Sequence, residues 1–194
     1  MEIYDTYEKP TEYGYRKLTV YYDFEPMNPR TEWDNLGKMI CLHGRYDLGD
    51  KHSFRDNEDI QEYIKENKIT SILPLFLYDH SGITISTGSF YSPWDSGQVG
   101  YIWITDEKIR NEYGVKRISK KLRLKILEYL ESEVNTYDQY LTGDVYGFEV
   151  TEFTRVNPKG DLEENELDSC WGFYGSDFED NGLFEHADFL GELD

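Results

Sequence analysis

Hydrophobic residues recur along this chain with two different periods, which predicts a mixture of strands and helices. The segment Arg16–Phe24 (RKLTVYYDF) alternates with a period of two and is rich in β-branched and aromatic residues, so we expect a strand. From Ser119 to Leu141, apolar residues instead recur every three or four positions, which predicts the longest helix of the chain. This apolar stripe comprises Leu122, Ile126, Leu130, Val134, Tyr137 and Leu141.

Shorter patterned segments fill much of the remaining chain. Strands are predicted at 38–43, 69–78, 83–86, 99–104, 145–153 and 169–174, and short helices at 57–67 and 105–111. The apolar run at 69–78 contains Pro74, which we expect at an edge, a bulge or a strand start. Because strands and helices do not alternate regularly, the pattern favours an α+β fold. We expect a single domain with a mainly antiparallel sheet, one long helix and shorter helices.

The two ends of the chain lack a clear period. Residues 1–15 are polar and rich in tyrosine, so we expect a flexible arm, and we place the α+β globular domain at 16–175. Within that domain, 157–168 is predicted to be a polar, acidic loop. Residues 176–194 are expected to form an acidic C-terminal extension. Part of it, 180–191, has the pattern of a short amphipathic helix whose apolar residues are Leu183, Phe184, Phe189 and Leu190.

The composition is that of a folded protein in a reducing compartment. Hydrophobic residues make up only 38% of the 194 residues, but 17 Tyr, 10 Phe and 4 Trp supply large apolar faces for a core. Cys41 and Cys170 are far apart and show no metal-binding or disulfide spacing, so reduced thiols are expected. The N-terminus has no basic and apolar leader pattern, and we therefore predict a cytoplasmic protein.

Charge is distributed very unevenly along the sequence. The chain has a formal net charge of −19, and the segment from Ile126 to Asp194 holds 19 acidic and only two basic residues. Such a surface repels nucleic acids and anionic membranes and attracts basic proteins. An acidic surface that serves only solubility would spread its charge more evenly. We therefore predict a basic, nucleic-acid-binding protein as the partner, and we expect neither a membrane nor a nucleic acid to be bound directly.

The candidate partner-binding residues are the acidic and aromatic side chains of the C-terminal third. Carboxylates on a rigid scaffold can replace phosphates in contacts with Arg and Lys, and exposed aromatic residues commonly anchor protein interfaces. The acidic candidates are Asp161, Glu163, Glu164, Glu166, Asp168, Asp177, Glu179, Asp180, Glu185 and Asp188. The aromatic candidates are Trp171, Phe173 and Tyr174.

Two other binding patterns occur in the sequence. Residues Asp177–Asp188 partly match a calcium-binding loop, with oxygen-bearing side chains at positions 1, 3 and 5 and Gly182 at position 6. The match lacks the bidentate Glu at position 12 and a preceding helix, so we interpret the segment as a solvated acidic turn and expect no metal site or cofactor. The basic segment 116–125, at the start of the long helix, offers an alternative function in phosphate or nucleic-acid contact.

Catalysis is a further alternative with weak support from the sequence. A cysteine- or histidine-dependent hydrolase would use Cys41, His43 and His80, because a thiol nucleophile needs an imidazole base within hydrogen-bond reach. No spacing links these residues beyond the shared strand face of Cys41 and His43, and no nucleotide-binding or nucleophile-elbow motif occurs. We therefore expect a protein that is not an enzyme.

Four stretches resemble a family of small proteins from phages and mobile genetic elements. They are Leu77–Thr84, Pro93–Tyr101, Tyr137–Gly147 and Asp168–Gly175, and the similarity runs over about 16–175. The resemblance implies an inhibitor of bacterial defence, specifically an anti-CRISPR protein that acts on Cas9, without assigning a role to any residue. Together with the charge, it predicts a DNA mimic that inhibits Cas9 or a restriction enzyme by occupying its basic DNA-binding surface.

Overall fold

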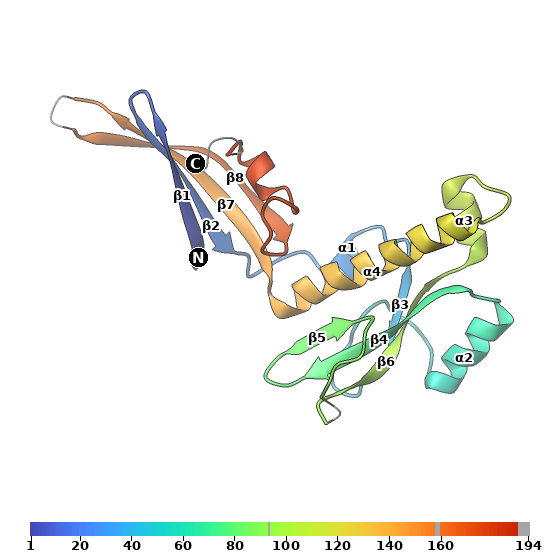
Figure 1. Ribbon diagram of the computed structural model, residues 1–194. Helices are drawn as coiled ribbons and strands as arrows, with labels where there is room; N and C mark the ends of the chain where they lie inside the picture. The colour runs from blue at the N-terminus through green and yellow to red at the C-terminus, as the bar shows by residue number, and fades with distance from the viewer. Residues whose placement is uncertain (93, 158–159, 190–194) are drawn as a thin grey trace. The chain divides into compact units, whose positions relative to one another are not determined.

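The computed structural model describes residues 1–92, 94–157 and 160–189, which form two four-stranded antiparallel sheets with helices (Figure 1). The predicted α+β class, with antiparallel sheets and one long helix, is confirmed. The chain divides into two compact units. Met1–Met27 and Gly143–Asp194 form the first, which we call the terminal unit, and Asn28–Thr142 form the second, which we call the inserted unit.

The sheet of the terminal unit combines strands from both ends of the sequence. Its order is β1-β2-β7-β8, where β1 is Ile3–Thr11, β2 is Gly14–Tyr22, β7 is Val145–Arg155 and β8 is Leu162–Tyr174. The two central strands bury one face of the sheet, because alternate positions carry apolar side chains. Leu18 lies opposite Val150, and Val20 lies opposite Phe148.

Two segments that we predicted to be irregular are strands. Residues 3–11 of the predicted flexible arm pair with β2 along their length as β1. Residues 162–168 of the predicted acidic loop form the first half of β8 and pair with β7. Both predictions were wrong because backbone hydrogen bonds to a neighbouring strand fix these edge strands, whereas their exposed side chains leave no hydrophobic period to detect.

The predicted acidic extension packs onto the sheet of the terminal unit. Its helix α5 is only four residues long, Leu183–His186, and shorter than the predicted helix. Phe178, Leu183 and Phe189 are buried in one cluster with Phe148 and other residues of the inner sheet face. Leu190, the last apolar residue of the predicted helix, lies outside the described residues. The acidic segment is therefore anchored through its apolar side chains, which leaves its carboxylates at the surface.

The inserted unit places its helices around a second sheet of order β3-β6-β4-β5. The strands are β3 (Lys38–Cys41), β4 (Ser71–Asp79), β5 (Ile83–Ser86) and β6 (Ser96–Ile104), and the helices are α1 (Pro29–Glu32), α2 (Asn57–Glu66), α3 (Asp106–Tyr113) and α4 (Lys120–Thr142). Pro74 is tolerated in β4 because β5 pairs only with the part of β4 that starts at Phe76. A bulge follows directly, between Leu75 and Phe76.

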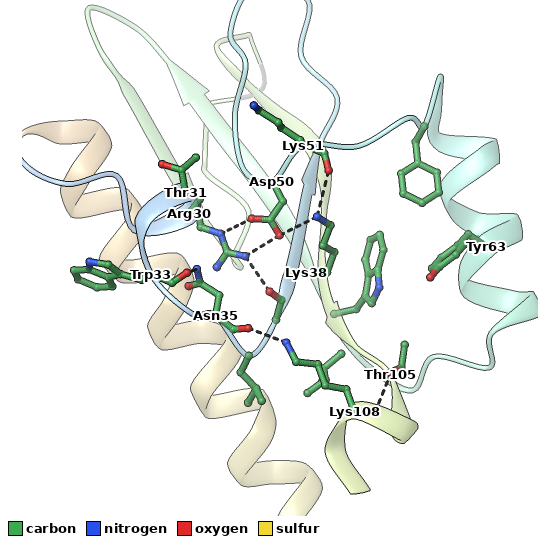
Figure 2. A pocket seen from close by; sticks show the side chains of 15 residues that line it. Arg30, Thr31, Trp33, Asn35, Lys38, Asp50, Lys51, Tyr63, Thr105 and Lys108 are labelled. Atoms are coloured by element: carbon green, nitrogen blue, oxygen red, sulfur yellow. Dashed lines mark hydrogen bonds and ion pairs between the residues drawn. The ribbon is translucent and has the colours of Figure 1, made fainter. Parts of the chain in front are cut away.

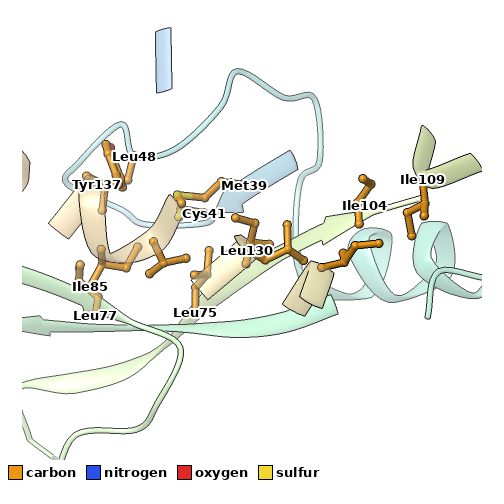
Figure 3. Close-up of a cluster of buried hydrophobic side chains, with 13 residues drawn as sticks. Met39, Cys41, Leu48, Leu75, Leu77, Ile85, Ile104, Ile109, Leu130 and Tyr137 are labelled. Carbon is orange, nitrogen blue, oxygen red and sulfur yellow. The ribbon is translucent and has the colours of Figure 1, made fainter. Parts of the chain in front are cut away.

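Helix α4 confirms the predicted long helix and supplies the core of the inserted unit. The hydroxyl of Ser119 accepts a hydrogen bond from the Leu122 amide, which caps the helix start as expected. The buried residues of its stripe, from Ile126 to Tyr137, join one apolar cluster with Met39 and Leu75 of the sheet (Figure 3). None of the described helices combines the length and the apolar character that a membrane span requires.

Candidate partner-binding surface

The division into units sharpens the charge asymmetry of the sequence. The terminal unit contains 21 acidic and 5 basic residues, a net charge of −16, whereas the inserted unit contains 18 acidic and 15 basic residues, a net charge of −3. The first 27 residues and the last 52, which are separated in the sequence, therefore contribute to one strongly anionic body.

The densest carboxylates lie on β8, at the edge of the terminal sheet. Every residue from Leu162 to Ser169 is exposed. The strand register places Glu164 and Glu166 on one face, opposite Phe153 and Thr151 of β7, and places Glu163 and Asp168 on the other face. A bulge between Val150 and Thr151 separates Asp168 from the other three acidic residues along the strand. We call the group Asp161, Glu163, Glu164, Glu166 and Asp168 the acidic edge.

The carboxylates of the acidic edge are available to an external cation. Within the described ranges, no predicted acidic candidate forms an ion pair, and Glu163, Glu164 and Glu166 make no side-chain hydrogen bond. Asp168 accepts only the neighbouring Ser169 amide, at 2.9 Å. Asp161 accepts a hydrogen bond of 2.6 Å from the Asn157 side chain. A basic partner would therefore meet these groups without first breaking an internal salt bridge.

The aromatic candidates differ in their exposure. Trp171 is 40% exposed, stacks on Tyr21 with 5.9 Å between ring centroids, and lies over Gly147, where an added Cβ would come within 2.1 Å of the indole. Phe173 is 8% exposed and packs on Phe148 at 5.7 Å, so it belongs to the core rather than to the surface. This candidate was wrong because the register of β8, set by a bulge, turns Phe173 to the buried face.

Tyr174 is also held inside the terminal unit. Its side chain is only partly exposed, and its hydroxyl donates a hydrogen bond to the Met27 carbonyl. The sequence reasoning missed Tyr21, which supports Trp171 and donates a hydrogen bond of 2.9 Å to Glu149. The alternation of Tyr15, Lys17, Thr19 and Tyr21 on one strand face could have indicated it, but only the strand order brings Trp171 alongside.

The remaining acidic candidates flank α5. Asp177, Glu179, Asp180, Glu185 and Asp188 are all exposed. Asp177 accepts hydrogen bonds from the backbone amides of Glu179 and Asp180, at 3.2 and 3.1 Å, as a turn residue does. Over the described part of the chain, no group of three or more His, Cys, Asp and Glu side chains is arranged to hold a metal ion. The segment that partly matches a calcium-binding loop thus has the hydrogen bonds of an acidic turn.

In the described part of the chain, no hydrogen bond joins the side chains of Cys41, His43 and His80 to one another. Cys41 is 5% exposed, and burial raises the pKa of its thiol to about 12. The Nδ1 atom of His43 lies 3.3 Å from the backbone amides of Arg45 and Tyr46, and the ring stacks on Tyr46. A second imidazole, His52, contacts the carbonyl oxygen of Cys41 rather than its sulfur. His80 lies in the exposed turn between β4 and β5, 3.8 Å from Asp95.

The raised pKa of the Cys41 thiol makes a testable difference between the two cysteines. At pH 8 almost no thiolate forms at Cys41, so we expect iodoacetamide to label only Cys170, which is partly exposed, in the folded protein. In a denaturant both thiols should react, as counted by mass spectrometry. Rapid labelling of Cys41 in the folded protein, checked against a Cys170→Ser variant, would contradict this assignment.

The basic segment 116–125 is mostly open to solvent. Lys116, Arg117, Lys120, Lys121 and Lys125 are exposed. The sixth residue, Arg123, donates hydrogen bonds to Thr70 and Ser71 and pairs with Asp106 at 3.4 Å, so it is used within the inserted unit. Lys125 lies over the ring of Tyr129 at 5.3 Å.

Comparison with protein families, curated proteins and solved structures finds no match to this chain. The candidate surface is therefore interpreted from its own geometry and charge.

Proposed function

We propose that this protein is an acidic, non-enzymatic inhibitor of a nucleic-acid-binding bacterial defence protein. It is of the anti-CRISPR or anti-restriction type, and it acts as a DNA mimic on the basic DNA-binding surface of its target. The single observation that carries the proposal is the net charge of −16 on the terminal unit, where an edge strand presents carboxylates that form no ion pair with any described residue.

The spacing of the acidic edge supports mimicry of a phosphate backbone. A strand rises about 3.3 Å per residue, so the four carboxylates from Glu163 to Asp168 extend over about 17 Å. This is about one charge per 5 Å, compared with one phosphate per 3.4 Å of axis along one DNA strand. Arg and Lys side chains are long enough to adjust to this difference, and an Arg can engage a carboxylate through two hydrogen bonds.

The exposed indole of Trp171 complements these charges. It lies on the same sheet face as Glu164 and Glu166, and its stacking on Tyr21 limits its conformational freedom before binding. Rigid aromatic side chains are frequent anchors of interfaces, and surrounding charges mainly accelerate and orient association. In this arrangement, the carboxylates steer the protein to a basic channel and Trp171 contributes apolar contact.

Competition with DNA tests the proposal directly. Purified Cas9 bound to its guide RNA, and separately a restriction enzyme, would be loaded with fluorescent cognate duplex and titrated with this protein. We expect displacement from at least one target, with an apparent inhibition constant that rises with DNA concentration and rises again between about 50 and 300 mM salt. Polyglutamate at equal carboxylate concentration is the matched control and should displace far less. Failure to displace DNA from either target, or displacement that is indifferent to salt, would overturn the proposal.

A further inference from the structure

The inserted unit contains an open pocket of about 680 Å³ that is basic, although the protein as a whole is strongly acidic. It lies where β3, the start of α3 and the segment after α1 meet (Figure 2). Its volume falls in the range of pockets that hold small organic ligands. No part of this pocket belongs to the acidic edge or to the terminal unit.

Three lysines give the pocket its charge. Lys38, Lys51 and Lys108 line it, and among the described residues Asp50 is the only acidic one in its lining. Lys38 lies 3.6 Å from Asp50 and donates a hydrogen bond to the Lys51 carbonyl, while Lys108 donates one of 2.8 Å to the Asn35 carbonyl. Carbonyl acceptors orient an ammonium group without cancelling its charge. Lys38 and Lys108 therefore present positive charge to a ligand, whereas the side chain of Lys51 points away from Lys108 (Figure 2).

The single carboxylate of the pocket is already neutralised. Arg30, whose side chain is 1% exposed, donates to both oxygens of Asp50, at 3.0 and 2.9 Å. The other side of the guanidinium is held by Glu133 at 2.8 Å and by the Gly37 carbonyl at 2.9 Å. The formal charges of the lining residues sum to +3. The sum is +2 when Glu133, which contacts Arg30 but does not line the pocket, is included.

An aromatic wall forms the apolar part of the pocket. Phe54, Tyr63 and Trp103 contact one another with ring centroids 5.4 to 6.1 Å apart, and Tyr63 remains 37% exposed. Lys38 is the direct cross-strand neighbour of Trp103, which places an ammonium group beside this wall. Trp33, 43% exposed, lies across the pocket from Tyr63 (Figure 2).

We propose that this pocket binds a nucleoside phosphate, with its phosphate between Lys38 and Lys108 and its base against the aromatic wall. Ammonium groups bind phosphate as point charges, and aromatic side chains stack on planar bases irrespective of base identity. A small phosphate ligand suits the local positive charge, whereas a long nucleic acid would also meet the acidic remainder of the chain. The site is independent of the DNA-mimic function and would remain if that function were disproved.

Isothermal titration calorimetry with the full-length protein tests this site. The probes are ADP, adenosine, inorganic phosphate and a 5′-phosphorylated tetradeoxyadenylate. We expect ADP to bind at least about tenfold more tightly than either adenosine or phosphate, because each of those lacks one of the two recognised parts. If the 5′-phosphorylated tetradeoxyadenylate binds more tightly than ADP, the ligand of the pocket is the phosphorylated end of a nucleic-acid strand, recognised by the same side chains. Equal binding of ADP and phosphate, or no binding of either nucleotide probe, would overturn the proposal.

Matched variants locate the binding. Lys38→Gln combined with Lys108→Gln should weaken ADP at least about tenfold, and Tyr63→Ala should weaken ADP while leaving phosphate binding unchanged. The control pair, Lys120→Gln with Lys121→Gln, removes the same charge from exposed positions outside the pocket and should leave affinity within about twofold. Equal losses of ADP affinity in the pocket double variant and in the control double variant would overturn the assignment of the site. Circular dichroism and thermal unfolding establish that each variant remains folded.

Discussion

Conversion of the acidic edge to amides is expected to weaken inhibition of the DNA-binding target by at least about a hundredfold. The variant carries Asp161→Asn, Glu163→Gln, Glu164→Gln, Glu166→Gln and Asp168→Asn. An exposed ion pair contributes about 0.5–1 kcal/mol, so five such pairs contribute about 3–4 kcal/mol, which corresponds to a hundredfold or more. The inhibition constant in the DNA-displacement assay measures the effect, and its dependence on salt should become shallower as well.

A control variant separates the acidic edge from net charge alone. Glu62, Glu66, Glu107, Glu112 and Glu128 are exposed residues of the inserted unit, and their conversion to Gln changes the net charge by the same five units. This variant should lose less than about fivefold in inhibition, because charges beyond the interface act mainly through screened, long-range attraction. Equal losses in both variants would show that any five carboxylates suffice, and full activity of the edge variant would disprove mimicry by β8.

The same experiment tests a structural role for these carboxylates. Charged side chains on an edge strand prevent it from pairing with another chain. If this were their only role, the edge variant would self-associate, as detected by light scattering, and its freshly isolated monomer would still displace DNA with unchanged affinity. Loss of displacement by a monomeric variant therefore supports binding through the acidic edge.

Replacement of Arg30 by alanine is expected to destabilise the inserted unit by about 3–5 kcal/mol. Burial alone would lower the pKa of this guanidinium, but Asp50 and Glu133 hold the pKa above its ordinary value, so the charge is retained inside the fold. Without Arg30, Glu133, which also accepts the Gly37 amide, would lose its counter-charge. Asp50, which also accepts the Met39 amide, would keep only Lys38 at 3.6 Å. Removal of one partner from a buried charge network carries a cost of this size.

Urea unfolding of the full chain, followed by tryptophan fluorescence and circular dichroism, measures the loss. Arg30→Lys keeps the charge but not the paired hydrogen bonds to Asp50, and it should recover part of the stability. The control is Arg55→Ala, which removes an 81% exposed Arg from a pair with Asp59 on the surface of the same unit, at an expected cost below about 1 kcal/mol. Similar values for Arg30→Ala and Arg55→Ala would contradict the structural role of Arg30.

The sequence predicted those parts of the fold whose side chains repeat on one face. Helix α4 and strand β7 carry apolar residues at regular intervals, and both were identified close to their observed limits. Strand β1 and the acidic half of β8 were missed, because Asp5, Glu8, Glu163 and Glu166 face solvent and produce no period. Their conformation depends on hydrogen bonds to strands distant in the sequence, and a local pattern does not contain this information.

The candidate sites show the same contrast. The acidic edge could be predicted because its charge is concentrated in one short stretch of sequence. The burial of Phe173 could not, since it depends on a bulge in the pairing of β7 and β8. The basic pocket was not foreseen at all. Its Arg30 lies 20 positions from Asp50 and 103 positions from Glu133, which holds Arg30 from outside the pocket. Lys108 belongs to yet another element.

The strand order of the terminal unit has a consequence for the order of events during synthesis. Strand β2 pairs with β7 across contacts such as Arg16 with Glu152, which are 136 positions apart, whereas the inserted unit is a continuous stretch of chain. Closing so long a loop is entropically costly and slow, and domains generally fold as they leave the ribosome. The inserted unit can therefore fold while the hairpin of β1 and β2 still awaits β7. A nascent chain that stops before Leu162 lacks β8. Translation of the last third of the chain therefore determines when the terminal unit, with its acidic edge, can form.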